Sequence, residues 1–433
     1  MSHRVAVVGG GIGGCAAALR LADEGHDVTL FEGSPNLGGL VVSFQVGGTP
    51  LECFYHHVFA HETDIIELIR RLGLELDWLE ASMGVLRNGR LWPFTSPFDL
   101  LRFSPLPLVD RVRMGVGALR MGRVKDWRRL DRVPALTWLE QHTGPRATQV
   151  IWEPLVRGKF GEAALTVPAA FMYGRFSQRS NARGRGSRER FGYLRGGFRR
   201  LFDALEKELG GLGVTIILGT PVTGIATQNR RVVGIRTADA TLDVDGVVFA
   251  GMLPRLGPLL ADDVRDPGWD SVGALGALVV VLELDRRVTP TYWTNVCDET
   301  APFAAIIEHT NLVPPGDYDG RHVMYLGRYF TLGEPIAVDD PEATATSWIE
   351  AFRARVPGAA DATILERHVF RTPYAAPLVQ IGHLTRLPSV TTDVSGLTLA
   401  TTAQIYPQDR GMSEGVALGR RAAEALIDQL DDR

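Results

Sequence analysis

The sequence predicts an α/β fold, α+β overall, in which a parallel sheet forms one domain and a mixed sheet with helices forms a second, interleaved domain. The first domain is indicated by a short apolar run at 4–8, which leads through a glycine-rich turn into a helix-forming stretch and a second apolar run. The second domain is indicated by strand-like segments around 275–283, 322–330 and 365–370, and by a mainly helical stretch at 98–150.

Composition narrows the class of protein. The chain has 433 residues, of which 45% are hydrophobic and 22% charged, as is typical of a globular protein large enough for two lobes. The formal net charge of −4 argues against a nucleic-acid-binding protein. The three cysteines lack C-x-x-C spacing, so we expect neither a metal site nor a disulfide framework. The longest apolar stretch, 272–284, contains Glu283 and is too short for a membrane span, so we expect a cytoplasmic protein without a signal peptide.

The strongest local motif lies near the N-terminus. The letters GGGIGG at 9–14 stand between the first predicted strand and a helix that contains CAAALRLA. In a βαβ dinucleotide-binding unit, successive glycines permit a tight turn, close approach of backbone N–H groups to a pyrophosphate, and close packing of helix on strand. Glu32 ends the second predicted strand, where a carboxylate can bind ribose hydroxyls. We therefore predict a Rossmann-like domain whose cofactor-binding residues include Gly9, Gly11, Ile12, Gly13, Gly14 and Glu32.

A second glycine pair, Gly38 and Gly39, favours FAD over NAD as the cofactor. The pair follows Glu32 closely and lets the chain approach the diphosphate again. An acid followed by Gly-Gly at this distance resembles the flavoprotein superfamily of amine oxidases, protoporphyrinogen oxidases, carotenoid desaturases and UDP-galactopyranose mutases. The resemblance implies a fold of the glutathione-reductase/amine-oxidase type and non-covalently bound FAD, with Val222 near the adenine. No second G-x-G-x-x-G opens a helix, so any NAD(P)H must reach the flavin without a Rossmann domain of its own; transiently bound NAD(P)H and O2 are the candidate redox partners.

The C-terminal segment is also similar to this superfamily. Residues 397–400 are typical of a strand, and 412–430 of a helix rich in Ala, Leu, Glu and Arg. In these flavoproteins the last helix points its N-terminus at the flavin, where the helix dipole stabilises negative charge. The resemblance implies cofactor contacts from Asp409, Gly411 and Met412, although TTAQIYPQDRGM at 401–412 replaces the usual Gly-Asp of this segment.

These motifs are spread along the chain, so the two domains are predicted to be discontinuous. The FAD-binding domain takes residues 1–75, 195–255 and 385–433. The substrate-binding domain takes residues 76–194 and 256–384.

Three histidines lie within six positions in the segment YHHVFAH at 55–61. Their spacing does not match a regular metal site, and no metal is predicted. A histidine beside a flavin can transfer protons or bind a substrate oxygen. We therefore predict catalytic roles for His56 and His57, with a polar hairpin tip packed on the flavin as the alternative.

Basic side chains form a second group of candidates. Arg157, Lys159 and Arg175 stand among Trp, Phe and Gly residues, which indicates partial burial, and a buried cation needs an anionic partner. The planar arginine fork suits phosphate and carboxylate groups. We predict that these three side chains and Arg410 bind a small anionic substrate, and that Arg175 is also catalytic. The arginines at 183–190 fit either such a clamp or a solvated loop.

Tyr406 is the last catalytic candidate. It stands with Asp409 and Arg410 between the last predicted strand and the last predicted helix, where the flavin ring is expected. Three polar side chains at this place are hard to explain as core, which favours contact with flavin or substrate.

Residues 100–132 mix Leu, Met and Val with nine Lys and Arg residues. A basic amphipathic stretch of this kind can lie on an anionic membrane, although a pair of surface helices is the commoner case. Membrane contact is therefore the less favoured prediction for this segment.

Further segments resemble the UDP-galactopyranose mutases: YHHVFAH at 55–61, NGRLWPF at 88–94, KFG at 159–161 with Arg175, and the stretch 404–412. That resemblance implies rearrangement of a nucleotide sugar, in which the reduced flavin attacks the anomeric carbon. The wider superfamily implies hydride transfer from the substrate to oxidised flavin. We predict an FAD-dependent oxidoreductase acting on a small anionic molecule, for example a nucleotide- or phosphate-linked sugar. The alternatives are a mutase and, third, a non-enzymatic FAD-binding module.

Overall fold

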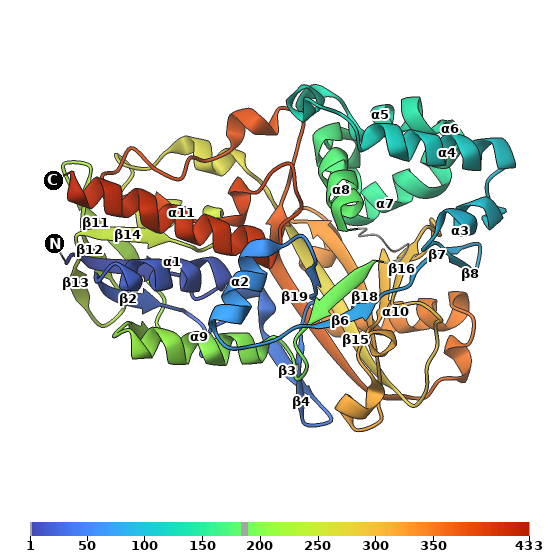
Figure 1. Cartoon of the computed structure of the whole chain (residues 1–433), viewed down its shortest axis with the longest axis horizontal. Helices are drawn as coiled ribbons and strands as arrows, with labels where there is room; N and C mark the ends of the chain where they lie inside the picture. The colour runs from blue at the N-terminus through green and yellow to red at the C-terminus, as the bar shows by residue number, and fades with distance from the viewer. Residues whose placement is uncertain (1, 183–188, 433) are drawn as a thin grey trace.

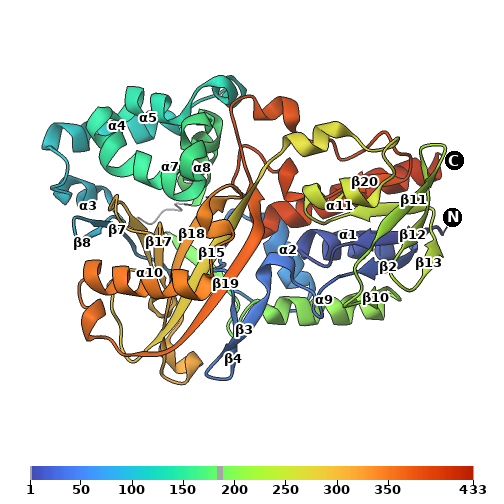
Figure 2. The ribbon, with the colours of Figure 1, turned by 180° about the vertical axis from the view of Figure 1, so that it is seen from behind.

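The computed structural model describes residues 2–182 and 189–432. Figure 1 shows a parallel sheet with helices near the two termini, and a longer twisted sheet with its own helices at the other end of the molecule. Figure 2 shows the same arrangement from behind, with helix α10 (Pro341–Arg355) lying across the strands of the longer sheet. The predicted mixture of a parallel and a mixed sheet is confirmed.

The parallel sheet has the strand order β10-β2-β1-β14-β20, and each neighbouring pair in it is parallel. Val5 and Val7 of β1 pack against the helices on one face, whereas Ala6 and Val8 pack into a second core on the other. Because both faces are buried, these strands are continuous apolar runs. The strands span Arg4–Val8 (β1), Asp27–Phe31 (β2), Thr215–Ile217 (β10), Gly246–Phe249 (β14) and Leu397–Leu399 (β20).

Helices α1 (Ile12–Asp23) and α11 (Met412–Asp431) cover one face of the parallel sheet. They cross very closely, since a Cβ atom on Gly419 would lie 2.0 Å from the carbonyl oxygen of Gly13. Glycine at this crossing therefore lets the first turn of α1 pack closely against α11. Helix α9 (Arg199–Gly211) packs beside α1 and β10.

An antiparallel sheet of three strands covers the other face. These strands are β11 (Gly224–Gln228), β12 (Arg231–Arg236) and β13 (Thr241–Asp243). Strand β11 begins at Gly224, so Val222 lies in the loop before it.

The mixed sheet has the strand order β19-β15-β18-β17-β16-β7-β8. Its neighbouring strands are antiparallel, except for the parallel pair β16 and β7. Trp348 and Phe352 of α10 pack against Leu278, Val280 and Leu282 of the sheet. The strands span Ile364–Pro377 (β19), Ala274–Leu284 (β15), His322–Thr331 (β18), Ala305–Glu308 (β17), Trp293–Val296 (β16), Met83–Arg87 (β7) and Arg90–Pro93 (β8).

A group of helices lies over the far end of this sheet, as Figure 1 shows. They occupy the stretch predicted to be mainly helical and extend beyond it. The helices span Pro97–Arg102 (α3), Leu108–Met121 (α4), Ala135–Thr143 (α5), Pro145–Ala147 (α6), Glu153–Phe160 (α7) and Ala169–Ala182 (α8). Helix α7 contacts β18 and so forms a wall of the space between helices and sheet.

A small connecting region joins the two sheets. Buried Glu52, at the end of a hairpin, accepts hydrogen bonds from the backbone N–H of Phe198 at 2.6 Å and from the hydroxyl of Tyr193 at 2.8 Å. The region contains the hairpin β3 (Ser43–Val46) and β4 (Thr49–Glu52), the sheet β5 (Val58–Phe59), β9 (Arg190–Tyr193) and β6 (Asp77–Glu80), and helix α2 (Thr63–Arg71). The division into domains at 75, 194, 255 and 384 stays a prediction. Among the helices of residues 2–182 and 189–432, none is long and apolar enough to cross a membrane.

Candidate functional site

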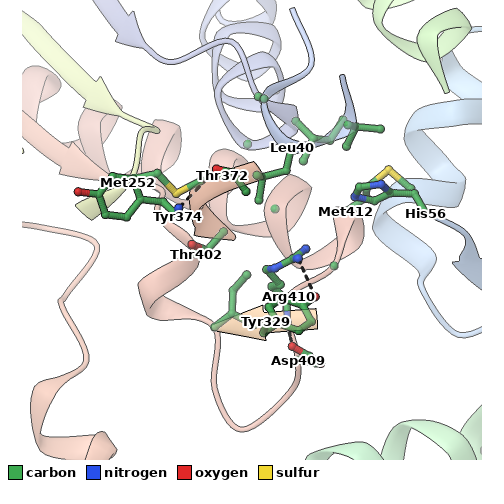
Figure 3. Close-up of a pocket in the computed structure, with 18 of the residues that line it drawn as sticks. Leu40, His56, Met252, Tyr329, Thr372, Tyr374, Thr402, Asp409, Arg410 and Met412 are labelled. Atoms are coloured by element: carbon green, nitrogen blue, oxygen red, sulfur yellow. Dashed lines mark hydrogen bonds between the residues drawn. The ribbon is translucent and has the colours of Figure 1, made fainter. Parts of the chain in front are cut away.

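A cavity of about 1230 Å³ extends from the parallel sheet to the mixed sheet. Figure 3 shows part of it, with Leu40 of the glycine-rich loop on one side and Tyr329 of β18 on the other. Most of the sequence-predicted site residues line this cavity: Gly9, Gly11, Ile12, Gly13, Glu32, Gly38, Gly39, His56, His57, Lys159, Arg175, Val222, Asp409, Arg410, Gly411 and Met412.

The glycine-rich turn forms the floor of the cavity at the parallel sheet. Gly9 has a φ of +111°, a conformation that side chains rarely adopt. A Cβ atom on Gly14 would lie 1.8 Å from the carbonyl oxygen of Gly9, so Gly14 lets α1 pack on the turn rather than lining the cavity. A Cβ atom on Gly39 would lie 3.1 Å from the Cα of Gly11, so the two glycine loops pass within van der Waals distance of each other. This bare backbone fits a diphosphate, which side chains here would displace.

Glu32 is held at the edge of the same cradle. Its carboxylate accepts hydrogen bonds from the backbone N–H groups of Gly10 at 2.7 Å and Ser34 at 2.8 Å. These bonds fix the carboxylate while leaving further lone pairs, because an ionised carboxylate accepts about four hydrogen bonds. A ribose diol is the group that such a fixed acid binds in dinucleotide sites.

The N-terminus of α11 faces the cavity through Gly411 and Met412. Its partial positive charge favours negative charge on a bound ring. Glu62 lies beside it and accepts a hydrogen bond from the backbone N–H of Phe59 at 2.6 Å. Burial raises the pKa of Glu62 to about 8, so this carboxyl group is mainly protonated at neutral pH and does not cancel the helix charge.

Four charged side chains meet on the side of the cavity away from the glycine turn. Asp409 accepts hydrogen bonds from Lys159 and, at 2.8 Å, from the guanidinium of Arg175. Arg410 donates to the hydroxyl of Tyr329 at 3.0 Å, as Figure 3 shows. Burial alone would raise the pKa of Asp409, but the nearby cations outweigh it and lower the pKa to about 2. Three cations and one carboxylate therefore leave this cluster with excess positive charge.

The two adjacent histidines have different surroundings. Nδ1 of His56 lies 2.5 Å from the carbonyl oxygen of Phe54, which can only accept, so Nδ1 carries the hydrogen and Nε2 keeps a lone pair. Burial, and secondly the charge of Arg410, lower the pKa of His56 to about 4, so the ring is neutral at pH 7. His57 instead stacks on Phe191 at a centroid distance of 4.1 Å. His56 is therefore the better-placed proton acceptor of the two.

Replacement of His56 by glutamine is expected to change the dependence of stability on pH. The pKa of about 4 in the folded protein lies below the ordinary 6.5, so the unfolded chain binds a proton first as the pH falls. The stabilising contribution of the neutral ring is complete above pH 6.5 and is lost progressively between 6.5 and 4. Denaturant unfolding of both proteins should show the wild type losing about 3 kcal/mol more than His56→Gln across this window. Equal losses would contradict the buried, neutral ring.

Several aromatic side chains line the remaining wall, and no sequence motif had pointed to them. They come from the helical turn Thr148–Trp152 before α7, from α8, from β16, and from β5 and β9 of the small sheet: Trp152, Phe171, Phe176, Trp293, Phe59 and Phe191. Tyr329 was missed as well, although it lies in a segment correctly predicted as a strand. Tyr325, four positions earlier on the same face of β18, is buried and does not line the cavity, so no local sequence pattern marked Tyr329 as a site residue.

Besides Gly14, two predicted site residues do not line the cavity. Arg157 pairs with Glu153 one helical turn earlier at 2.8 Å, and 46% of its side chain is exposed. Tyr406 is buried, and its hydroxyl donates to Asp131 at 2.7 Å. Tyr406 is therefore part of a core after all, because an acid distant in sequence satisfies its hydroxyl. His61 also lies outside the lining, against the ring of Phe59.

Tyr406→Phe is accordingly expected to affect stability rather than chemistry. Removal of the hydroxyl leaves buried Asp131 without one of its hydrogen-bond donors, which should cost about 1–3 kcal/mol of unfolding free energy. Denaturant titration measures this loss, and flavin content and turnover should stay at the wild-type level. Loss of turnover with unchanged stability would indicate that Tyr406 takes part in the reaction.

The arginine-rich stretch is only partly described. Arg183, Arg185 and Arg188 lie outside the described residues. Arg190 is exposed and donates to the backbone oxygen of Trp78 at 3.0 Å.

The bare glycine cradle, the fixed acid and the helix N-terminus fit FAD, and together they define an FAD-binding fold. The chain belongs to the family of flavin-containing amine oxidoreductases, whose family model matches residues 12–427. The predicted superfamily, the FAD cofactor and the oxidoreductase class are thereby confirmed.

Among curated proteins, a probable zeta-carotene desaturase of Synechococcus elongatus is 28% identical over 35% of this chain and 37% of its own length. A coproporphyrinogen III oxidase of Staphylococcus aureus is 23% identical over 53% of this chain and 56% of its own length. The matched part of the chain thus spans less than two thirds of either relative.

Solved structures resemble the chain along its full length. Cyclohexylamine oxidase from Brevibacterium oxydans has a TM-score of 0.74 at 17% identity and covers 100% of both chains. A reduced UDP-galactopyranose mutase has a TM-score of 0.78 at 15% identity, over 99% of this chain and 96% of its own. At such low identity these likenesses establish the fold alone.

Proposed function

We propose that this oxidoreductase takes a hydride from an organic anion that has an apolar body. The observation that carries the proposal is the cluster of Lys159, Arg175 and Arg410 around a single carboxylate, in a cavity whose other walls are mainly apolar and include several aromatic side chains. A buried cluster with excess positive charge is stabilised by a bound anion. Aromatic walls bind an apolar body and exclude water from it.

The cofactor and the side chains of the site have separate roles in the proposed reaction. Bound FAD supplies the hydride acceptor. Arg175 presents its guanidinium to the anionic group of the substrate while Asp409 holds the arginine in place. The neutral ring of His56 accepts the proton that a substrate O–H or N–H group releases when the neighbouring C–H bond gives up its hydride. Phe171 and Trp293 help to confine the substrate between the helices and the mixed sheet.

The names of the relatives favour oxidation over rearrangement. The curated relatives are named as a desaturase and an oxidase, and a solved neighbour is named as an amine oxidase. The alternative, rearrangement of a nucleotide sugar, is supported by the same cation cluster, which fits a diphosphate, and by the likeness to the mutase. Location in the cytoplasm is a further prediction, which cell fractionation would test.

Anaerobic stopped-flow reduction of the bound flavin tests the requirement for an anion. The substrates would be pairs of aromatic or polyisoprenoid carboxylic acids that also carry an alcohol or amine group, and their methyl esters, which differ in charge but hardly in shape. The acid of a reactive pair is expected to reduce the flavin at least ~10-fold faster at low concentration, since a charge-assisted hydrogen bond contributes about 1.5–3 kcal/mol. Equal rates for acid and ester would contradict the proposal.

A further inference from the structure

Helices α3 and α4 expose an apolar surface that the reaction does not use. Of the thirteen large apolar side chains that are exposed among the described residues, seven lie between 98 and 119. Soluble proteins rarely gather exposed apolar side chains in this way unless the patch binds something. Figures 1 and 2 both show α3 and α4 at the end of the molecule far from the two termini.

The apolar side chains of α4 form one stripe. Val109, Val112, Val116 and Leu119 are spaced by three, four and three positions, so they share one face of the helix. Their relative exposures are 77%, 52%, 42% and 66%. The opposite face of α4 is buried through Met114 and Met121, so the stripe is a second apolar face rather than the one that packs on the protein. Phe98 and Leu101 of α3 are also exposed, and with the stripe they make up what we name the α3–α4 face.

Basic residues accompany this face. Residues 97–121, which contain both helices, have four Arg residues but two Asp residues, within a chain whose formal net charge is −4. Arg113 and Arg120 each follow a stripe valine by four positions, which places them along one side of the stripe, and both are exposed. An apolar stripe bordered by arginines matches the interface of a bilayer, where acyl chains lie beneath anionic headgroups.

We propose that the α3–α4 face docks on the surface of a membrane that contains anionic lipid. The charge pattern argues against a second copy of this chain as the occupant, because two such faces would bring like charges together. Docking of this kind needs only a partly immersed helix face, not a spanning helix.

The docked face would lie close to the cavity. Leu100 of α3 packs in the same core cluster as Trp152 and Leu155, and the latter two side chains line the cavity. The face and the cavity therefore lie on two sides of one helical layer. This inference does not depend on the proposed substrate, since docking can be measured without turnover.

Sedimentation of the FAD-loaded full chain with vesicles tests the proposal. Vesicles of phosphatidylcholine alone would be compared with vesicles that also contain phosphatidylglycerol, at low and high salt. The wild type is expected to bind the anionic vesicles at least ~10-fold more strongly at low salt, and to lose this preference at high salt. Val109→Asp combined with Val116→Asp is expected to weaken binding by at least ~10-fold, because both apolar side chains leave the bilayer interface. Arg120→Gln is expected to weaken binding roughly fivefold.

Val338→Asp is the matched control, since Val338 is 82% exposed and lies outside the α3–α4 face. It should bind vesicles as the wild type does, and all variants should retain the flavin. Equal binding to both vesicle types, or equal binding by the wild type and the double aspartate variant, would overturn the proposal. A wild-type dimer in lipid-free sedimentation that the double variant dissociates would overturn it too, and would assign the face to a second copy.

Discussion

Gly11→Val is expected to give a folded protein that has lost its FAD. A Cβ atom on Gly11 would meet only the Cα of Gly39, at 3.8 Å, so the empty cradle accommodates the substitution. The valine methyl groups would extend from there into the space that the diphosphate requires. We expect FAD affinity to fall by about 100-fold or more, which corresponds to roughly 3 kcal/mol. The measurement is the ratio of flavin to protein absorbance after purification, together with FAD titration of the apoprotein.

Substitutions at other glycines distinguish loss of the cofactor from loss of the fold. Gly14→Ala would place a Cβ atom 1.8 Å from a backbone oxygen and should unfold the domain, whereas Gly11→Val should keep the melting temperature of the wild-type apoprotein. Gly210→Val in α9, where a Cβ atom meets nothing within 4 Å, serves as the control and should bind FAD normally. Stoichiometric FAD in Gly11→Val would show that the diphosphate does not lie on this turn.

Arg175→Gln has the second largest expected effect, on substrate affinity. The side chain keeps 37% exposure into the cavity although Asp409 binds one end of it, so part of the guanidinium is available to a ligand. Loss of a charge-assisted hydrogen bond costs about 1.5–3 kcal/mol, so KM for an anionic substrate should rise by roughly 10- to 150-fold. Flavin content should stay unchanged, because Gly11 and Glu32 on the far side of the cavity are untouched.

Arg157→Gln provides a matched control from the same helical region. Arg157 is exposed and forms an ion pair with Glu153, and it does not line the cavity. Its replacement should leave KM within a factor of about two, since exposed ion pairs of this spacing contribute a few tenths of a kcal/mol. If Arg157→Gln raised KM as much as Arg175→Gln did, the cation cluster would not be the anion site.

The cofactor half of the site was predictable because local sequence determines it. The turn at 9–14, Glu32 and Gly38-Gly39 lie within a single βαβ unit, and their roles follow from backbone geometry over short distances. The last helix was predictable from its composition and periodicity, and it begins at Met412 as expected. Each of these features depends on residues that are neighbours in the chain.

The substrate half was predicted less well because distant residues create it. Arg157 and Lys159 are two positions apart, and on a helix this spacing points them about 200° apart, so they could not both face the cavity. That error was avoidable once 153–160 was taken as a helix. Tyr406 was different, because its partner Asp131 is 275 positions away and no local pattern shows that its hydroxyl is satisfied. The aromatic side chains of the wall likewise come from five separate elements.

The most direct test of the central claim is the mass of the product and the redox state of the flavin in one anaerobic incubation. The oxidised protein would be mixed with a set of carboxylated and phosphorylated compounds that includes nucleotide sugars, and a second sample would be reduced with dithionite first. Hydride transfer predicts a product lighter by two hydrogens, formed in the oxidised sample together with an equivalent amount of bleached flavin. An isomer of unchanged mass that forms only in the reduced sample would contradict the oxidoreductase reaction and establish the rearrangement instead.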